Sequence, residues 1–270
     1  SSMIDIFLAH ALIKALPLQA HIIFIGDINQ LPSVGPGNIL HDLISSTIIP
    51  YIQLTEIFRQ AADSLIITNA HKINNGEFPI TSGQSHKKDF IFIKESDPHN
   101  SINYIKKILF IELKKFGLKP HDAQILVPMN RGVVGCYNLN HELQNLLNPH
   151  PKNSIQRNGI TYKEGDKVMQ IRNNYDKNSF NGDLGTITTI AIEDGIIMVQ
   201  FGTNIIEYSA DELNELVLAY ATTIHKSQGS EYPAIIIPIF MQHYTLLQRN
   251  LLYTAVTRAK KLCVLLGEPK

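Results

Sequence analysis

The chain has 270 residues, 44% of them apolar and 18% charged, which is ordinary for a soluble globular protein of one or two compact units. Its 24 Lys and Arg residues balance 24 Asp and Glu residues, which argues against an overall basic surface for nucleic acid but leaves room for a local groove. Two cysteines exclude a disulfide framework and favour a reducing cytoplasm, and the apolar runs are too short to cross a bilayer.

The first half of the chain alternates predicted helices and strands. A helix is predicted over residues 3–16, followed by the apolar run "HIIFI" at 21–25, which is typical of a strand buried on both faces of a parallel sheet. The remaining predictions are helices over 37–46, 54–76 and 98–117 and strands over 89–95 and 123–129. This alternation indicates an α/β sheet covered by helices.

The pattern changes after Pro149. Short strands and turns fill residues 158–210, and Asp194-Gly195 between two β-rich runs predicts a hairpin, so this stretch reads as a small barrel. Strands at 216–221, 234–239 and 262–267 and a helix at 245–260 then return to the α/β pattern. We therefore expect a β module inserted into an α/β domain.

The stretch "GDINQLPSVGPG" at residues 26–37 leaves the predicted strand at 21–25 through Gly-Asp and contains two prolines. A plain connector rarely needs such stiffening. We interpret the loop as a rigid holder for Asp27 and Gln30 at the edge of a sheet.

Arg258 falls between Leu247 and Leu251 on the apolar side of the predicted helix at 245–260. It could meet an anion or a carboxylate there, or it could form a structural salt bridge or extend to solvent. The wheel leaves these interpretations open.

Three further polar groups stand at element ends. The stretch 221–231 crowds hydroxyl, amide and basic side chains into a turn closed by Gly229, which suits phosphate oxygens but also an ordinary polar loop. Asn130 and Arg131 directly follow a predicted strand, where a plain turn is an equal interpretation. Arg59 lies on a predicted helix, with an ion pair to Glu56 as the simpler role.

Other signatures are missing from the sequence. It contains no G-x-x-x-x-G-K-[ST] phosphate loop, and its one Asp-Glu pair, Asp211-Glu212, is more simply the start of a helix. No two of the 11 histidines lie closer than nine residues apart, so no local metal-ligand pair is present and no metal site is predicted.

In order along the chain, "GDINQLPSVGPG", "LTEIFRQA", "ILVPMNRG", "YATTIHKSQGSEYP" and "LLYTAVTRAK" resemble the later motifs of superfamily 1 DNA helicases, closest to the RecD-like helicases (the exodeoxyribonuclease V alpha-subunit family) of the stand-alone type. The resemblance covers nearly the whole chain. It implies two RecA-like α/β motor domains of the P-loop NTPase helicase type with ATP and Mg²⁺ between them, and an inserted SH3-like barrel.

The resemblance also implies residue roles. Gln30 would sense the γ-phosphate, Asp27 would fix its loop, and Arg59 and Arg258 would reach the γ-phosphate from the second motor domain. The other implied contacts are the nucleotide with Gly229 and Glu231, Glu231 accepting from the ribose hydroxyl, and single-stranded DNA with Asn130, Arg131, Thr223 and His225.

The same resemblance divides the chain. Residues 1–52 would be the tail of a first motor domain, 53–157 and 211–270 the two parts of the second, and 158–210 the inserted barrel. The family's phosphate loop and Mg²⁺-binding Asp-Glu would precede residue 1, so the chain reads as a C-terminal fragment.

The implied function is part of an ATP-dependent 5′ to 3′ DNA helicase of DNA repair and recombination, acting on single-stranded DNA and duplex ends and not at a membrane. Without a phosphate loop, we expect the chain alone to be inactive and to bind no nucleotide firmly. The alternatives are the motor of a relaxase-helicase, which a nicking domain upstream would reveal, and a nucleotide-independent DNA-binding or scaffold module.

Overall fold

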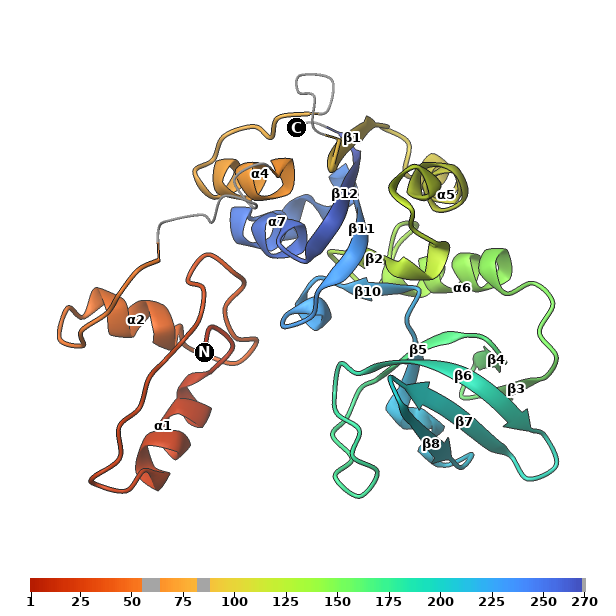
Figure 1. The fold of residues 1–270 in the computed structure, drawn as a ribbon, viewed down its shortest axis with the longest axis horizontal. Helices are drawn as coiled ribbons and strands as arrows, with labels where there is room; N and C mark the ends of the chain where they lie inside the picture. Colours follow the sequence, from red (N-terminus) through yellow and green to blue (C-terminus); the bar gives the residue numbers. More distant parts are fainter. Residues whose placement is uncertain (55–63, 82–87, 269–270) are drawn as a thin grey trace.

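A five-stranded parallel sheet forms the centre of the molecule (Figure 1). The computed structural model describes residues 1–54, 64–81 and 88–268. The strands lie in the order β1 (Phe90–Lys94), β12 (Ala259–Gly267), β11 (Tyr232–Ile239), β2 (Ala123–Val127) and β10 (Ala221–Thr223). Strand β11 lies between β12, which follows it in the sequence, and β2, which is far from it in the sequence. The parallel strands are therefore joined by crossover connections, as in α/β folds.

Helices cover both faces of this sheet. Helices α4 (Leu65–Asn74) and α7 (Arg249–Val256) lie on one face, and α5 (Ser101–Lys107) and α6 (Cys136–Leu147) lie on the other (Figure 1). Successive residues of β11 serve the two layers in turn: Ile235 and Ile237 pack with the α4 and α7 side, and Ile236 packs with the α5 and α6 side. The continuous apolar run is therefore explained by burial on both faces.

Local sequence sets the helix ends. Ser64 caps α4 by accepting from the backbone N–H of Ile66, and Gly76, with φ of 78°, follows its end. The helix predicted over 98–117 is present as consecutive helical segments that end at Gly117, with φ of 67°. Those segments are 3₁₀ helix Pro98–Asn100, α5, π-helical turn Ile108–Glu112 and 3₁₀ helix Leu113–Phe116. Further 3₁₀ turns are Pro120–Asp122, Glu212–Glu215, His225–Ser227 and Met241–Leu246.

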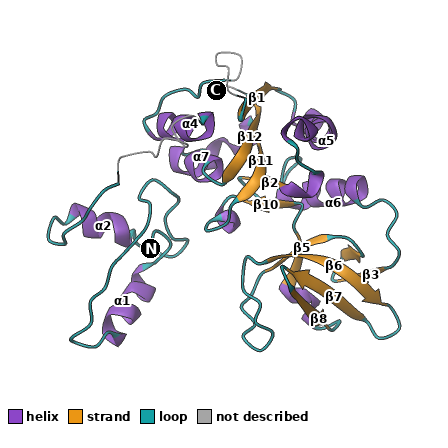
Figure 2. Cartoon of the chain, in the orientation of Figure 1, coloured by secondary structure: helices purple, strands orange, loops and turns teal. Residues whose placement is uncertain are grey.

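A second, antiparallel sheet forms the predicted β module (Figure 2). Its strands lie in the order β8 (Asn204–Tyr208), β7 (Ile196–Phe201), β6 (Leu184–Ala191), β5 (Lys167–Gln170) and β9 (Leu216–Leu218), with a separate hairpin of β3 (Ser154–Arg157) and β4 (Ile160–Lys163). The hairpin predicted at Asp194-Gly195 joins β6 to β7. Strands β3 and β9 extend the β-rich region beyond the expected range 158–210.

One predicted strand divides between the two sheets. The run at 216–221 was expected to be a single strand, but β9 pairs with β5 in the β module and β10 pairs with β2 in the parallel sheet. Only Ala219 and Tyr220 separate them, so the β module is joined to the sheet by an extended, almost uninterrupted stretch of chain.

A buried carboxylate fastens the β module to the α/β layers. Asp166 is fully buried just before β5, and it accepts hydrogen bonds from Gln144 and Asn148 at the end of α6 and from the hydroxyl of Tyr220. The backbone N–H of Lys163 is a fourth donor, at 2.8 Å. Burial raises the pKa of Asp166, and these donors oppose that shift by stabilising its charge.

The N-terminal residues differ from the expectation. Helices α1 (Ile6–Ala15) and α2 (Ile39–Ser45) form as predicted, but α1 buries only Ala9. The strand predicted at 21–25 is absent, and Ile23 and Ile25 are 83% and 80% exposed. Within residues 1–54 the structure contains no second strand to pair with this run, so its backbone has no ladder to join.

Candidate functional site

The loop after residue 25 is held as a rigid turn around Asp27. One carboxylate oxygen of Asp27 accepts from the backbone N–H of Asn29 at 3.0 Å. The other oxygen accepts from the Gln30 amide at 3.1 Å and from the Tyr253 hydroxyl of α7 at 2.9 Å. Burial and the neighbouring Asp27 carboxylate raise the pKa of Tyr253, which keeps its hydroxyl protonated as a donor.

The same loop is anchored through Leu31. Its backbone N–H donates to the Thr254 hydroxyl at 2.8 Å, and its carbonyl accepts from the Gln228 amide at 2.8 Å. The Leu31 side chain is buried in the core layer of α4 and α7. The loop that carries Gln30 is therefore fixed against α7 through Asp27 and Leu31, and against the 224–231 loop through Leu31.

Arg258 is buried at the end of α7, with 7% of its surface exposed. Its guanidinium donates to the Thr254 carbonyl at 3.2 Å, the Ser230 carbonyl at 3.1 Å and the Thr257 hydroxyl at 3.3 Å. Within the described residues no carboxylate lies within 4.0 Å of it. Burial lowers the pKa of Arg258, and the more distant Glu231 and Asp27 carboxylates act in the opposite direction.

Arg258 and the Gln30 loop share one support. Thr254 binds Leu31 through its hydroxyl and Arg258 through its carbonyl, and Tyr253 binds the Asp27 that holds Gln30. The structure thus brings Gln30 and Arg258 to the same end of α7. Arg59 lies outside the described residues.

Glu231 and Gly229 lie beside Arg258. Glu231 is exposed and pairs with Lys260 at 2.8 Å, and this hydrogen bond lowers the pKa of Glu231. Gly229 is exposed with φ of 81°. Both residues precede the amino end of β11, and Arg258 precedes the amino end of β12, so all three lie at the amino ends of two adjacent parallel strands.

The four candidate DNA contacts lie at the carboxyl ends of the strands, on the opposite side of the sheet from Glu231 and Arg258. Strands β2 and β10 are parallel neighbours with Thr223 aligned to Val127. Asn130 and Arg131 follow β2, and His225 follows β10, so all lie beyond the carboxyl ends of adjacent strands. Asn130, Arg131 and His225 are exposed, whereas Thr223 is 8% exposed and accepts from the Lys226 N–H at 3.4 Å.

Three supporting residues were missed by the sequence analysis. Tyr253, Thr254 and Gln228 hold the Gln30 loop, and Tyr253 and Thr254 make those contacts across more than 220 positions of sequence. Helical periodicity separates an apolar from a polar face but does not identify the partner of a polar side chain. No local signal could have found them.

Comparison with known proteins identifies three regions of this chain. Residues 139–201 match the SH3 domain of ATP-dependent RecD-like DNA helicases, residues 218–266 match the UvrD-like helicase C-terminal domain, and residues 1–96 match an AAA domain. The ATP-dependent RecD2 DNA helicase of Deinococcus radiodurans is 34% identical over 259 residues, which is 96% of this chain and 34% of that protein. These similarities support the resemblance to the RecD-like helicases of superfamily 1 over nearly the whole chain.

Another RecD-like relative is the RecBCD enzyme subunit RecD of Buchnera aphidicola subsp. Acyrthosiphon pisum, which is 28% identical over an alignment that covers all of this chain and 53% of that protein. The chain therefore spans about a third to a half of the length of these curated relatives.

Solved structures of Pif1 helicases share the fold. The enzyme from Candida albicans has a TM-score of 0.55 at 19% identity, and covers 89% of this chain and 62% of its own. The Bacteroides enzyme in complex with ADP-AlF3 and single-stranded DNA has a TM-score of 0.51 at 20% identity, over 89% of this chain and 60% of its own. The predicted RecA-like fold with an SH3-like insertion is confirmed.

Two further kinds of feature are absent from the described residues. No helix among them is both long and apolar enough to span a membrane. No group of three or more His, Cys, Asp or Glu side chains in the described part of the chain is arranged to hold a metal ion.

Proposed function

We propose that this chain is part of an ATP-dependent DNA helicase that moves 5′ to 3′ on single-stranded DNA, in which Arg258 and Gln30 contact the γ-phosphate of ATP. The observation that carries the proposal is the buried Arg258 guanidinium. The described hydrogen-bond partners of this buried cation are all neutral oxygens, so no carboxylate contacts it, and a triphosphate would supply a negative charge in contact.

Because the Gln30 loop and Arg258 are both held by α7, a movement of one should be coupled to a movement of the other. Any movement of α7 toward a bound nucleotide carries the Asp27 turn with it, because Tyr253 and Thr254 hold both. Gly229 and Glu231 flank Ser230, whose carbonyl accepts from Arg258, and Glu231 would accept from the ribose hydroxyl of the same ligand. Mg²⁺, bound with ATP, would neutralise phosphate charge; the described residues contribute no carboxylate cluster to it.

The two ends of the parallel strands would then have different roles. Nucleotide contacts lie at the amino ends of β11 and β12, and DNA contacts lie at the carboxyl ends of β2 and β10. The 224–231 loop runs from one of these ends to the other, and Gln228 within it binds Leu31. Nucleotide-dependent closure can therefore change the position of the DNA-contacting end, as stepping requires.

An arginine substitution tests the nucleotide assignment. In an intact enzyme that contains this chain and a phosphate loop, Arg258→Ala should lower DNA-stimulated ATPase turnover by about 10³-fold, since an arginine on the transferring phosphoryl group contributes on that scale. Lys261→Ala, an exposed neighbour, is the matched control. Equal turnover for both variants would remove Arg258 from the reaction.

A binding measurement tests the DNA assignment. Fluorescence anisotropy with a single-stranded oligonucleotide should show that Arg131→Ala weakens binding by about fivefold and lowers the salt dependence by about one phosphate contact. Arg157→Ala, an exposed arginine on β3, is the control. Identical curves for the two variants would exclude the carboxyl ends of β2 and β10 as the DNA path.

The chain alone, lacking the phosphate loop, should hydrolyse ATP negligibly with or without single-stranded DNA. Robust turnover by the purified chain would contradict this. Direction is tested in the intact enzyme with forked duplexes that carry a single 5′ or 3′ tail, and unwinding should require the 5′ tail.

A further inference from the structure

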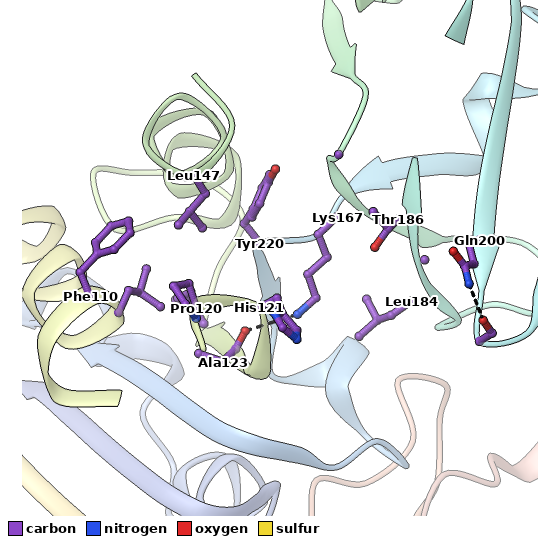
Figure 3. A pocket seen from close by; sticks show the side chains of 15 residues that line it. Phe110, Pro120, His121, Ala123, Leu147, Lys167, Leu184, Thr186, Gln200 and Tyr220 are labelled. Atoms are coloured by element: carbon purple, nitrogen blue, oxygen red, sulfur yellow. Dashed lines mark hydrogen bonds between the residues drawn. The ribbon is translucent and has the colours of Figure 1, made fainter. Parts of the chain in front are cut away.

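A cleft of about 1010 Å³ separates the parallel sheet from the β module (Figure 3). One wall comes from the α5 side of the sheet, including Phe110, Pro120 and Leu147. The other comes from β5, β6 and β7 and includes Lys167 and Leu184. None of the candidate nucleotide or DNA residues lines it, so it is a separate feature of the molecule.

The cleft has apolar walls, and its basic lining residues are Lys167 and His121, whose ring lies 3.3 Å from the Asp122 carboxylate. Phe110, Pro120, Leu147 and Leu184 present carbon surface to it, and the side chain of Lys167 crosses it from the β module toward the amino end of β2 (Figure 3). The polar side chains Thr186 and Gln200 stand at exposed positions of strands β6 and β7. Gln200 already donates to the Gly202 carbonyl, so it offers little to a ligand.

Lys167 is only partly satisfied. Its ammonium has three N–H donors, and the one described acceptor is the Ala123 carbonyl at 3.3 Å. No carboxylate among the described residues lies within 4.0 Å of it. Asp122 is the nearest negative influence, but its oxygens accept from the Lys119 N–H and lie 3.3 Å from the His121 ring.

The backbone beneath Lys167 is fixed. Its carbonyl accepts from the Ala219 N–H at 2.8 Å, and the preceding residue is the fully buried Asp166. The Asp166 carboxylate is engaged by four donors, Tyr220 among them, and does not pair with the ammonium. Lys167 is thus held in place by elements of both domains, with donor capacity left over in an apolar surrounding.

Burial acts on this group as expected for a desolvated cation. It lowers the pKa of Lys167 to about 8, with Asp122 opposing the shift. A negatively charged ligand in the cleft would relieve that cost, because it would pair with the ammonium.

We propose that this cleft binds a monocarboxylate with an apolar body, with Lys167 as the counter-ion of the carboxylate and Leu184, Leu147 and Phe110 in contact with the body. Lys167 is the one lysine or arginine among the lining residues, and His121 already faces Asp122, so the cleft suits a single negative charge, whereas a polyphosphate or a nucleic acid strand would need several cations. The proposal is independent of the helicase function.

The test uses the full chain with octanoate as the probe and NMR of lysine labelled with ¹³C at Cε. Lys167→Gln identifies the Lys167 resonance by its loss. Octanoate should shift that resonance in a saturable manner and raise its apparent pKa, and 1-octanol, of equal length but uncharged, should not. Hexanoate should bind about tenfold more weakly, because each buried methylene contributes about 0.8 kcal/mol.

Two variants separate charge from packing. Read at the ¹³C-labelled methyl groups of Leu184, Lys167→Met should weaken octanoate binding at least tenfold while keeping an apolar side chain of similar length. Lys163→Met is the matched control, since Lys163 lies four positions earlier and donates to Asn145 outside the cleft. Its octanoate affinity should equal that of the unchanged chain.

A pH titration of the unchanged chain gives an answer that does not depend on any variant folding. Octanoate affinity should fall by about tenfold between pH 7 and pH 9, because the Lys167 ammonium loses its proton over that range. The proposal is overturned if Lys167 titrates near the ordinary lysine pKa, if octanol and octanoate shift the Lys167 resonance equally, or if Lys167→Met binds octanoate as well as Lys163→Met.

Discussion

Two similar apolar runs differ in burial and in secondary structure in this molecule. "HIIFI" at 21–25 remains outside any sheet, with Ile23 83% exposed. "AIIIPI" at 234–239 forms most of β11, and Ile235, Ile236 and Ile237 are fully buried. Strand β11 has β12 on one side and β2 on the other to accept its backbone hydrogen bonds. An apolar run becomes a strand only where neighbouring strands pair with it.

The largest expected difference between these runs is in stability. Ile236→Ala should lower the free energy of unfolding by about 3 kcal/mol, since it removes buried methyl groups and leaves a cavity between β11 and the α5 and α6 layer. Ile23→Ala should change it by less than about 0.5 kcal/mol. Urea unfolding followed by circular dichroism measures both, and equal losses would mean that Ile23 is buried in solution.

Acid should next distinguish the buried region that follows β11, which contains His243, from the exposed run at 21–25. His243 is fully buried, its Nδ1 accepts from the Phe240 N–H at 3.2 Å, and burial lowers its pKa to about 4. In the unfolded chain a histidine takes up a proton near pH 6.5. Folding therefore opposes protonation, so the contribution to stability is present above pH 6.5 and is lost as the pH falls toward 4.

At pH 4.5 this loss should be about 2.5 kcal/mol relative to pH 7. Urea unfolding at pH 7, 5.5 and 4.5 measures it, and His243→Gln should show a correspondingly smaller decline. His21→Gln, at the start of the exposed run, should follow the unchanged chain at every pH. A His243→Gln curve parallel to that of the unchanged chain would contradict the assignment.

A smaller effect is expected where the N-terminal loop contacts α7. Tyr253→Phe removes the hydrogen bond to Asp27 and should cost about 1 kcal/mol, confined to the loop. Amide hydrogen exchange of Asn29 and Leu31 should accelerate by about fivefold. Tyr244→Phe, an exposed tyrosine, is the control, and unchanged exchange in Tyr253→Phe would show that the contact does not hold the loop.

The smallest effect is expected at the exposed start of β12. Lys260 and Glu231 form an ion pair whose side chains are 56% and 58% exposed, so solvent screens most of its energy. Lys260→Met should shift the urea midpoint no more than Lys261→Met does. A clearly larger shift for Lys260→Met would place this pair in a less hydrated setting than its exposure indicates.

The elements predicted correctly are those whose sequence signal is local. The helix ends at Gly76 and Gly117, the hairpin at Asp194-Gly195 and the buried strand at 234–239 follow from turn chemistry and periodicity. The strand at 21–25 was wrong because its formation depends on partners, and the single strand at 216–221 was wrong because its two halves pair in different sheets.

The candidate site was predictable only in part. The wheel placed Arg258 on the apolar side of a helix over 245–260, but α7 ends at Val256 and Arg258 follows it, where the structure nonetheless buries it. Its contacts with Thr254 and Ser230, and the docking of the Asp27 turn on Tyr253, depend on how distant segments pack. The roles of Gln30, Arg59, Arg258 and the DNA-contacting residues stay predictions until the measurements above are made.

The two-residue passage from β9 to β10 has a mechanical consequence. The Gln124 amide donates to the carbonyls of both Ala219 and Tyr220, and Lys167 receives the Ala219 N–H from the opposite side, so the passage is clamped and not a swivel. A clamped, extended tether transmits tension along its axis far better than torque. A force applied at His225, just after β10, would therefore be transmitted to β9 in the β module as tension along one strand, with no hinge between them.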